Sequence, residues 1–437
     1  MELSGKKVLV VGLGRSGRAA ATLARSEGAR VVGVDTRIGL APIDGVVLEL
    51  GPHRRARFEE ADLVVVSPGI PLTQPDLAAA RALGKPLIGE LALAAERLTQ
   101  PMVAITGTNG KSTVTSFTGQ LLAAAGHRPF VGGNLGVPLC EAVLADDAAD
   151  TVVVEVSSYQ LELPGQLAPD VGVVLNLSPD HLARHGTMER YAAAKTALFA
   201  QQRADQLAVL PAHAPLLHAA MPPSAAQRAF LGALPGVVRR ATTAEIELPQ
   251  GRWSLDLAQV PVLGDHNLDN AATAAMLALA VGADPDGVQQ GLGRLEALAH
   301  RMQPVVEHGQ VLWVNDSKAT NLDAATVGIG GMPRPAVVLL GGRAKEGTDY
   351  GALAPILGRH RAVLCFGEAG PMMAEQLTRR GVAVERLATM SDAVDRARAL
   401  ATPGDAVLLS PGGSSFDAYD NFEKRGEHFI ALARETS

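Results

Sequence analysis

The sequence predicts an α/β protein built from three domains, at residues 1–90, 91–298 and 299–437. Its 437 residues correspond to about three domains of ordinary size, each long enough to bury its own core. Short apolar runs typical of buried strands alternate with helical patterns, which favours parallel sheets covered by helices. Glycine-rich turns follow two of these runs directly, at 12–17 and 107–113. We therefore expect a Rossmann-like N-terminal domain, a central domain of the P-loop ATPase type and a Rossmann-like α/β C-terminal domain.

The composition is that of an ordinary globular protein, with 47% hydrophobic and 19% charged residues. The net charge of −6 and the lack of a basic stretch argue against a nucleic-acid partner. Cys140 and Cys365 lie in different predicted domains and match no metal-binding spacing, so we expect core residues in a reducing compartment. The first ten residues lead into a strand, so we expect no signal peptide, and the longest apolar run, 271–282, is too short to span a bilayer. We expect a cytoplasmic protein without membrane insertion.

The first domain has the pattern of a small nucleotide-binding unit. Its strands are expected at 7–12, 30–34, 62–67 and 86–89, and its helices at 18–27 and 75–83. The turn Gly12-Leu-Gly-Arg-Ser-Gly17 and an acid about 20 positions further on, Asp35, match the dinucleotide-binding pattern. Such loops bind many nucleotides and also occur as plain tight turns, and no second nucleotide-binding half follows before residue 107. We therefore expect this domain to hold a phosphorylated ligand other than NAD.

The second domain is organised around Ile105-Thr-Gly-Thr-Asn-Gly-Lys-Ser-Thr113, between a strand at 102–105 and a helix at 112–125. Strand, glycine loop and helix in this order are the context of a phosphate-binding loop, in which backbone N–H groups and the helix N-terminus face the phosphates. Lys111 is expected to reach the β- and γ-phosphates, and the Ser112 hydroxyl is expected to bind Mg²⁺. The alternative is a polar turn with one exposed lysine. The flanking strand and helix favour ATP binding.

Acidic and polar side chains follow further strands of this domain. Glu155 lies near the end of a strand at 151–156, where a carboxylate can hold Mg²⁺ beside a phosphate loop; the alternative is pairing with a lysine. A turn at 132–136 can present Asn134, and a strand at 171–176 leads to Asp180-His181. Lys195 lies within a helix at 189–202, where a lysine is normally solvated. The short strands expected between 205 and 261 suggest no chemistry.

The run Gly264-Asp-His-Asn-Leu-Asp-Asn270 precedes a helix at 271–281, and His266, Asn267 and Asn270 could cap that helix. The third domain begins with a hairpin, 305–307 with 311–315, and continues with strands at 336–340, 362–366 and 406–409. Polar loops follow three of its strands, at 316–321, 341–345 and 410–416. Ligands gather at the carboxyl ends of strands in open α/β sheets, so we expect these loops to form one binding face.

Together these spaced motifs resemble those of the Mur ligases of peptidoglycan synthesis. The shared motifs are the loop at 107–113, Glu155-Val-Ser-Ser-Tyr-Gln160, Asp180-His181, Lys195, His266-Asn267 with Asn270, His300-Arg301, and Asn315-Asp-Ser-Lys-Ala-Thr-Asn321. The run at 315–321 and the segment 410–426 are most similar to the glutamate-adding branch of the family. The resemblance covers all three domains. Two features depart from the family pattern: Ala183 replaces an acid found in many relatives, and the loop at 341–347 is one residue longer.

The resemblance implies a set of site residues for each ligand. For ATP they are Gly107, Thr108, Asn109, Gly110, Lys111, Ser112, Thr113, Asn270, Arg301 and Asp316. For the UDP-linked substrate in the N-terminal domain they are Gly14, Arg15, Ser16, Asp35, Thr36, Arg37 and Gly69, joined by Asn134, Gln160 and His181. For the incoming amino acid they are Lys318, Thr320, Lys345, Ser415 and Phe422. For two Mg²⁺ ions they are Ser112, Glu155, His181 and Lys195, the last carbamoylated. Lys111, Lys195, His181 and Glu155 are the implied catalytic residues.

The activity implied by the resemblance is that of a monomeric, ATP-dependent amide ligase. Its substrates would be UDP-N-acetylmuramoyl-L-alanine, D-glutamate and ATP, and an acyl phosphate would form before glutamate attacks. The alternatives are another Mur-type or folylpolyglutamate-synthase-like ligase, a nicotinamide dehydrogenase on the first glycine loop, and a nucleotide-regulated binding module. The dehydrogenase leaves the ATP loop and the run at 315–321 unexplained. A binding module without turnover would not explain the metal-site residues Glu155 and Lys195.

Overall fold

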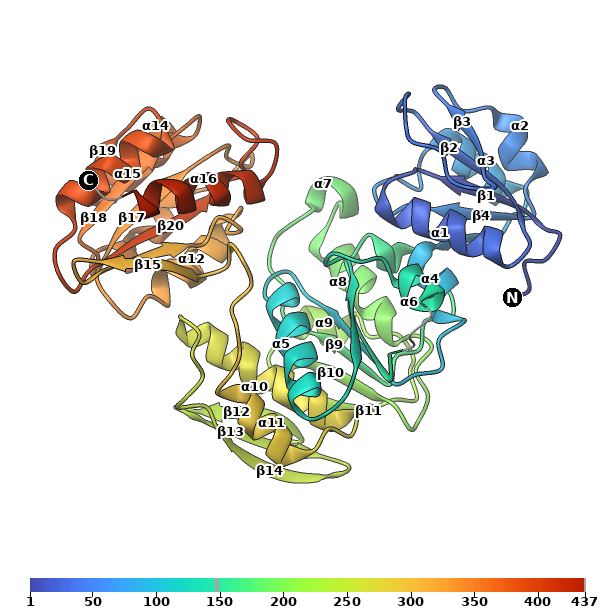
Figure 1. Cartoon of the computed structure of the whole chain (residues 1–437), viewed down its shortest axis with the longest axis horizontal. Helices are drawn as coiled ribbons and strands as arrows, with labels where there is room; N and C mark the ends of the chain where they lie inside the picture. The colour runs from blue at the N-terminus through green and yellow to red at the C-terminus, as the bar shows by residue number, and fades with distance from the viewer. Residues whose placement is uncertain (146–148, 436–437) are drawn as a thin grey trace. The chain divides into compact units, whose positions relative to one another are not determined.

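Three β-sheets flanked by helices make up the described part of the chain (Figure 1). A computed structural model describes residues 1–145 and 149–435. The sheets are wholly or mostly parallel, which confirms the predicted α/β class with three domains. The chain gathers into two compact units: Met1–Gln259 with Ala271–Gly293, and Val260–Asn270 with Arg294–Ser437. The domain boundaries expected after residues 90 and 298 remain predictions.

The first sheet is parallel throughout, as in a Rossmann-like half. Its strands, in spatial order, are β3 (Val47–Leu50), β2 (Arg30–Asp35), β1 (Lys7–Val11), β4 (Leu63–Val66) and β5 (Leu87–Gly89). Its helices are α1 (Arg15–Ser26), α2 (Arg55–Glu60), α3 (Pro75–Ala82) and α4 (Glu90–Ala95). The sequence pattern does not predict β3 or α2, because β3 is a half-exposed edge strand and α2 is very short. Helix α1 begins before the predicted residue 18, since the Arg18 N–H donates to the Gly14 carbonyl and carries the helix back to the glycine loop.

The second sheet is parallel except at one edge, where β12, β13 and β14 run antiparallel. Its strands, in spatial order, are β14 (Gly251–Asp256), β13 (Thr243–Leu248), β12 (Gly236–Arg240), β11 (Gln227–Leu231), β10 (Leu207–Pro211), β9 (Val171–Val174), β6 (Met102–Thr106), β8 (Thr151–Glu155) and β7 (Pro129–Gly133). Its helices are α5 (Lys111–Ala124), α6 (Leu139–Leu144), α7 (Leu182–His185), α8 (Met188–Thr196), α9 (Pro215–Ala219) and α11 (Pro285–Leu292), with the short 3₁₀ helices η1 (Gln160–Glu162) and η2 (Ala197–Phe199). The single helix predicted at 189–202 is wrong in its second half, because α8 ends where the Thr196 hydroxyl donates to the Ala220 carbonyl.

Helix α10 (Asp265–Ala280) begins six residues before the predicted start at 271. His266, Asn267 and Asn270 therefore lie inside its first turns, and the suggestion that they cap a helix at 271 is wrong. The amide of Asn267 donates to the Leu263 carbonyl at 2.6 Å, and the amide of Asn270 donates to Asn267 Oδ1 at 2.9 Å. Asn and Asp favour helix ends in general, and here one amide bonds back to the residue Leu263 before the helix and the other bonds within its first turns.

The third sheet is parallel except for its edge strand β15. Its strands, in spatial order, are β15 (Gln303–His308), β16 (Val311–Asn315), β20 (Ala406–Gly412), β17 (Ala336–Gly341), β18 (Ala362–Phe366) and β19 (Val384–Arg386). Its helices are α12 (Leu322–Gly330), α13 (Ala354–Leu357), α14 (Gly370–Arg379), α15 (Met390–Leu400), α16 (Phe422–Arg434) and the 3₁₀ helix η3 (Tyr350–Leu353). Strand β20 extends three residues beyond the predicted end at 409, so Ser410 belongs to the sheet.

The parallel pairing gathers the loops that carry the predicted site residues. In the first sheet β1, β2 and β4 are neighbours, so the loops that follow them share one edge. In the second sheet β6 lies between β8 and β9, and their following loops likewise meet at one edge. In the third sheet β20 lies between β16 and β17. Each sheet therefore presents one loop cluster at the carboxyl ends of its strands, where α/β proteins bind ligands.

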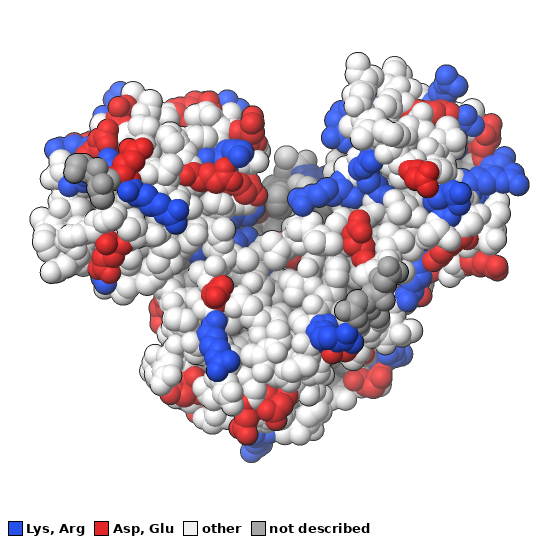
Figure 2. All heavy atoms as spheres, in the orientation of Figure 1, with Lys and Arg blue, Asp and Glu red and all other residues white. Residues whose placement is uncertain are grey.

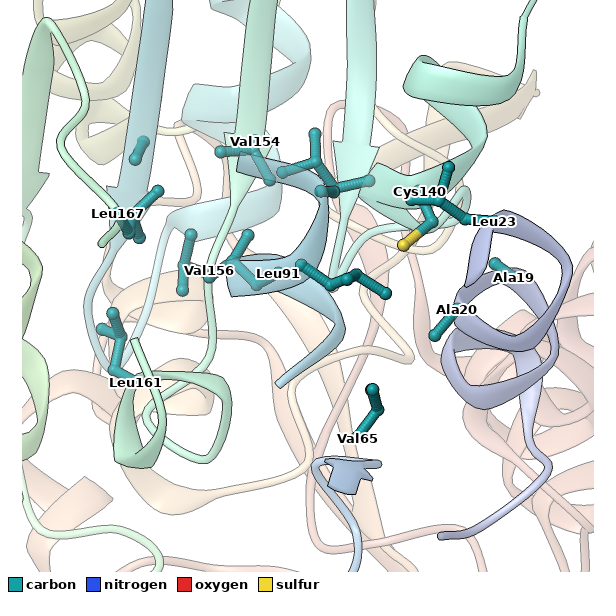
Figure 3. Close-up of a cluster of buried hydrophobic side chains, with 14 of the residues drawn as sticks. Ala19, Ala20, Leu23, Val65, Leu91, Cys140, Val154, Val156, Leu161 and Leu167 are labelled. Carbon is teal, nitrogen blue, oxygen red and sulfur yellow. The ribbon is translucent and has the colours of Figure 1, made fainter. Parts of the chain in front are cut away.

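One hydrophobic core joins the first two sheets inside the first unit. Ala19, Ala20 and Leu23 of α1 pack in the same cluster as Leu91 of α4 and Cys140 of α6 (Figure 3). This cluster also contains strand residues of both sheets, such as Val65 and Val154. The structure thus places Cys140 in a core, as expected, and burial raises the pKa of its thiol.

Charged side chains of both signs are interspersed over the face shown in Figure 2. Within residues 1–145 and 149–435, no helix has the length and apolar character needed to cross a membrane.

Candidate active site

The predicted ATP loop lies between strand β6 and helix α5. Gly107 and Gly110 have φ angles of +154° and +81°, which are unfavourable for residues with a Cβ. A Cβ on Gly107 would also lie 3.0 Å from the Cβ of Leu175. The Lys111 Nζ donates to the carbonyls of Gly107 and Thr108, both at 2.8 Å. Because α5 begins at Lys111, its N-terminus adjoins the loop, the arrangement that suits an anion.

Lys195 reaches the same loop from helix α8. Its side chain is buried, and its Nζ donates to the Gly107 carbonyl at 2.7 Å, so Lys111 and Lys195 share one acceptor. The Nζ also lies 4.5 Å from the centroid of the Tyr191 ring. Burial, together with the charge of Lys111, holds the pKa of Lys195 well below its usual value. The sequence pattern alone suggested a solvated lysine, but the side chain is buried, and its surroundings shift its equilibrium toward the neutral amine.

Glu155 lies opposite Ile105 of β6, close to the ATP loop. Its Oε1 accepts from the Asn134 side-chain amide at 2.5 Å, and its backbone carbonyl accepts from the Asn134 N–H at 2.8 Å. Its Oε2 is buried and has no hydrogen-bond partner among the described residues. A buried carboxylate oxygen without a partner is unfavourable. A cation beside Glu155 would remove this penalty.

The residues at this position suit Mg²⁺ when it is bound together with phosphates. Glu155 offers a free carboxylate oxygen, and Ser112 contributes a hydroxyl from the first turn of α5. In the described parts of the chain, no three or more His, Cys, Asp or Glu side chains gather into a metal-binding cluster. Mg²⁺ commonly uses one or two protein oxygens plus substrate phosphates and water. The donor set therefore fits such an ion and does not resemble a preformed all-protein cage.

His181 lies at the other side of this loop cluster. It has a left-handed backbone, with φ of 55°, and its side chain is exposed. Its Nδ1 lies 3.0 Å from the Tyr159 hydroxyl, and its ring centroid lies 6.3 Å from that of Tyr191. Tyr191 therefore lies beside both His181 and Lys195. Gln160 is buried nearby, and its Oε1 accepts from both the N–H and the hydroxyl of Ser157.

The predicted UDP-binding residues lie in the loops after β1, β2 and β4. Asp35 accepts from the Leu13 N–H at 2.7 Å and from the Arg37 guanidinium at 2.8 and 3.0 Å. These bonds, with that of Arg37 the largest cause, hold the pKa of Asp35 well below its usual value. Arg15 donates to the carbonyl of Gly136, in the loop that also carries Asn134. The remaining predicted residues of these loops are Gly14, Ser16, Thr36 and Gly69.

The second unit holds the other predicted residues. Asp316 is buried after β16; its Oδ2 accepts from the Ser410 hydroxyl at 2.9 Å, and burial raises its pKa to about 7. The Lys318 Nζ lies 3.6 Å from the centroid of the Phe422 ring. Ser415 is buried, whereas Lys345 is exposed. The remaining predicted residues of this unit are Asn270, Arg301 and Thr320.

Some residues with structural roles in these clusters are not singled out by the sequence. Arg425 is fully buried and donates to the Ser317 and Gly413 carbonyls, so it connects two of the predicted polar loops. Tyr191 lies one helical turn before Lys195, a spacing that could have signalled their contact. Asn176 bonds to the ATP loop. The sequence places Asn176 at the end of a strand expected at 171–176, and this position does not predict a contact with the ATP loop.

Three models of known protein families match successive segments of the chain. Residues 6–89 match the model described as Mur ligase MurD-like, N-terminal domain; residues 105–278 match Mur ligase middle domain; and residues 300–413 match Mur ligase, glutamate ligase domain.

Among the most similar curated relatives are two named UDP-N-acetylmuramoylalanine–D-glutamate ligase. That of Anaeromyxobacter dehalogenans is 43% identical, over 99% of this chain and 98% of its own, and that of Acidobacterium capsulatum is 40% identical, over 99% and 97%. Among solved structures, the fold resembles MurF ligase from Thermotoga maritima in complex with ADP (TM-score 0.62, 18% identity, over 99% of this chain and 95% of that one). It also resembles the UDP-N-acetylmuramate–alanine ligase MurC of the same organism (TM-score 0.61, 18% identity, over 98% and 99%).

Proposed function

The chain belongs to the Mur ligase family, and from this premise we propose that it joins D-glutamate to UDP-N-acetylmuramoyl-L-alanine with consumption of ATP. Relatives named for that reaction align with it over nearly their whole length. Within the site, the proposal is carried by the convergence of Lys111 and Lys195 on the Gly107 carbonyl. The buried carboxylate of Glu155 adjoins this point and carries an oxygen without a partner.

In the first step we propose that the carboxylate of the L-alanyl group attacks the γ-phosphorus of ATP. The bond from that phosphorus to the β-phosphate oxygen breaks, which gives an acyl phosphate and ADP. Lys111 would turn from the loop carbonyls to the β- and γ-phosphates and stabilise the charge that develops on them. The loop N–H groups that follow Asn109 and the first turn of α5 would hold the phosphates in line. Asn270, Arg301 and Asp316 are proposed as further ATP contacts.

Ser112, Glu155, His181 and Lys195 are proposed to hold the two Mg²⁺ ions of the family, which would neutralise phosphate charge when bound. An ammonium at Lys195 would oppose such ions. Its buried site favours the neutral amine, the form that can add to the carbon of CO₂. The new N–C bond gives a carbamate, and the amine proton passes to solvent. We propose this carbamate because it gives the side chain a negative charge and two oxygens suited to Mg²⁺.

The UDP-linked substrate is proposed to bind along the loops of the first sheet and the residues Asn134, Gln160 and His181. Asp35 joins the first two of these loops, because it accepts from Leu13 and from Arg37. We propose that this junction fixes the site for the UDP group.

In the second step the amino group of glutamate attacks the acyl carbon, phosphate leaves, and the nitrogen loses a proton. We propose that Lys318, Thr320, Lys345, Ser415 and Phe422 bind the incoming amino acid. The buried Ser415 hydroxyl, with backbone N–H groups of its loop, would meet the side-chain carboxylate. Arg425 supports these loops through the Ser317 and Gly413 carbonyls. A monomer in the cytoplasm is the proposed working form.

The proposal is tested by phosphate release with ATP, Mg²⁺ and UDP-N-acetylmuramoyl-L-alanine. D-Glutamate, L-glutamate, L-alanine and diaminopimelate are supplied in turn. We expect strong turnover with D-glutamate alone. The donors are fixed in place, so only an amino acid with this side-chain length and this configuration at its α-carbon can bring its side-chain carboxylate to them. Comparable rates with L-alanine or diaminopimelate would assign the chain to another reaction of the family.

A further inference from the structure

Asn176 lies beside the ATP loop but belongs to a different strand connection. It follows β9, the neighbour of β6, and the pairing of Thr106 with Val174 brings the ends of the two strands together. The Leu175 N–H donates to the Thr106 carbonyl, so the alignment continues to the residue before Asn176. The loop after β9 therefore runs alongside the ATP loop from its first residues.

The side chain of Asn176 bonds to two successive residues of that loop. Its Oδ1 accepts from the Thr108 N–H at 3.0 Å and from the Asn109 N–H at 2.9 Å. Its Nδ2 donates to the Asn109 carbonyl at 3.0 Å. Both ends of one amide are thus used on the backbone between Gly107 and Gly110. Ser178 adds a second connection, because its N–H donates to the Thr108 hydroxyl at 3.1 Å.

These bonds supply a restraint that the loop itself lacks. Gly107 and Gly110 give the backbone great freedom on either side of Thr108 and Asn109. The peptide planes between them decide where the Gly107 carbonyl points, and that carbonyl accepts from both Lys111 and Lys195. We propose that Asn176 is a positioning residue for the ATP loop, fixing Thr108 and Asn109 so that phosphates meet a prearranged backbone and correctly placed lysines. This inference rests on the ATP-binding role proposed for residues 107–113.

Replacing a residue that merely stabilises the fold should lower stability without changing nucleotide binding. The chain offers a matched control for this case. Gln202 is a buried amide of the same domain, and its Nε2 donates to the carbonyls of Pro169 and Leu207 at 2.9 and 3.0 Å. It holds backbone as Asn176 does, but it has no bond to the ATP loop. Gln202→Ala should lower the melting temperature without changing ATP binding.

The experiment compares Asn176→Ala, Gln202→Ala and the unchanged full chain. Nucleotide affinity is measured directly by calorimetry with ADP and ATP, and KM and kcat are measured for each substrate. We expect Asn176→Ala to weaken nucleotide binding and raise the KM for ATP by about 10-fold or more, since three side-chain hydrogen bonds to the loop are lost. The KM for the UDP-linked substrate should stay unchanged. If Asn176→Ala behaves as Gln202→Ala does, with lower stability and unaltered nucleotide binding, the inference is overturned.

A second variant decides the matter if Asn176→Ala fails to fold. Asn176→Asp keeps the shape and the oxygen that accepts from the Thr108 and Asn109 N–H groups. It replaces the N–H donor to the Asn109 carbonyl by an oxygen and adds a negative charge beside the phosphates. It should bind nucleotide more weakly, and the loss should shrink at high salt because the repulsion is screened. Binding equal to that of the unchanged chain would again overturn the inference. Failure of the unchanged chain to bind ATP would instead contradict the proposed function.

Discussion

At the scale of single residues, Lys195 owes its proposed role to its surroundings. A solvated lysine has a pKa near 10.4 and keeps its charge at neutral pH. Lys195 is instead buried against Tyr191 and shares the Gly107 carbonyl with Lys111, so its pKa is lowered and the neutral amine becomes accessible. Its helical position, without this contact, would suggest a solvated side chain.

Lys195→Ala should therefore lower kcat by about 10²-fold or more, the typical effect of losing an electrostatic group at a reacting centre. A small carboxylic acid such as formate should restore part of the activity by supplying oxygens in the vacated space. Phosphate release with and without the acid measures both effects. Lys85→Ala, at a partly exposed lysine between α3 and β5, controls for general activation by the acid. Full activity of Lys195→Ala would contradict the proposed role.

Asp316 gives a second residue-scale prediction, on stability against pH. Its folded pKa of about 7 lies above the value of 3.8 for a free aspartate, because burial favours the neutral acid. Its contribution to stability is complete below about pH 4 and is lost as the pH rises through about 7. The free energy of unfolding should therefore fall by on the order of 4 kcal/mol between pH 4 and pH 7.

Asp316→Asn mimics the neutral acid, so its free energy of unfolding should lose this decline between pH 4 and 7. Chemical denaturation at several pH values between 4 and 7 measures the free energy of unfolding of the variant and of the unchanged chain. Asp405→Asn is the control of opposite sign, because the Arg361 guanidinium lowers the pKa of Asp405 and its contribution is lost in acid instead. Parallel stability curves for Asp316→Asn and the unchanged chain would show that folding does not raise the pKa of Asp316.

At the scale of elements, the junction of β7 with its following loop sets the position of Asn134. Gly133 ends β7 with φ of +93°, and a Cβ there would lie 2.3 Å from the Glu155 carbonyl oxygen. Gly133→Ala should cost about 2–4 kcal/mol of stability and raise the KM for the UDP-linked substrate, because the contact of Asn134 with Glu155 must shift. Gly84→Ala is the matched control: its φ is also positive, at +71°, but a Cβ there would meet nothing within 4 Å. Equal effects of both variants on this KM would contradict the argument.

The elements also show how far sequence reasoning reaches. A buried strand, a glycine loop and a helix follow one another closely, so the glycine loop at 107–113 and the strand bearing Glu155 could be predicted from local pattern. The bonds of Asn176 and Tyr191 to Thr108 could not, because they depend on which strands and helices become neighbours. The early start of α10 was missed for a local reason, since its polar first turns resemble a loop.

At the scale of the whole molecule, the first unit contains two sheets that share one core. Leu91 of α4 is buried in that core beside residues of α1 and α6. Leu91→Ala should destabilise the unit by about 2–5 kcal/mol and lower hydrogen-exchange protection in both sheets together. Leu364→Ala, in the third sheet, should reduce protection there instead. A response of Leu91→Ala confined to one sheet would show that the core is not cooperative.

The central claim is that the chain forms an amide through an acyl phosphate made from ATP. The most direct measurement uses UDP-N-acetylmuramoyl-L-alanine labelled with ¹⁸O in its terminal carboxylate, followed by mass spectrometry of the released phosphate. An acyl phosphate requires one labelled oxygen to pass from the carboxylate to phosphate, and we predict that transfer in each turnover. Label found in AMP, or unlabelled phosphate beside newly formed amide, would contradict the account.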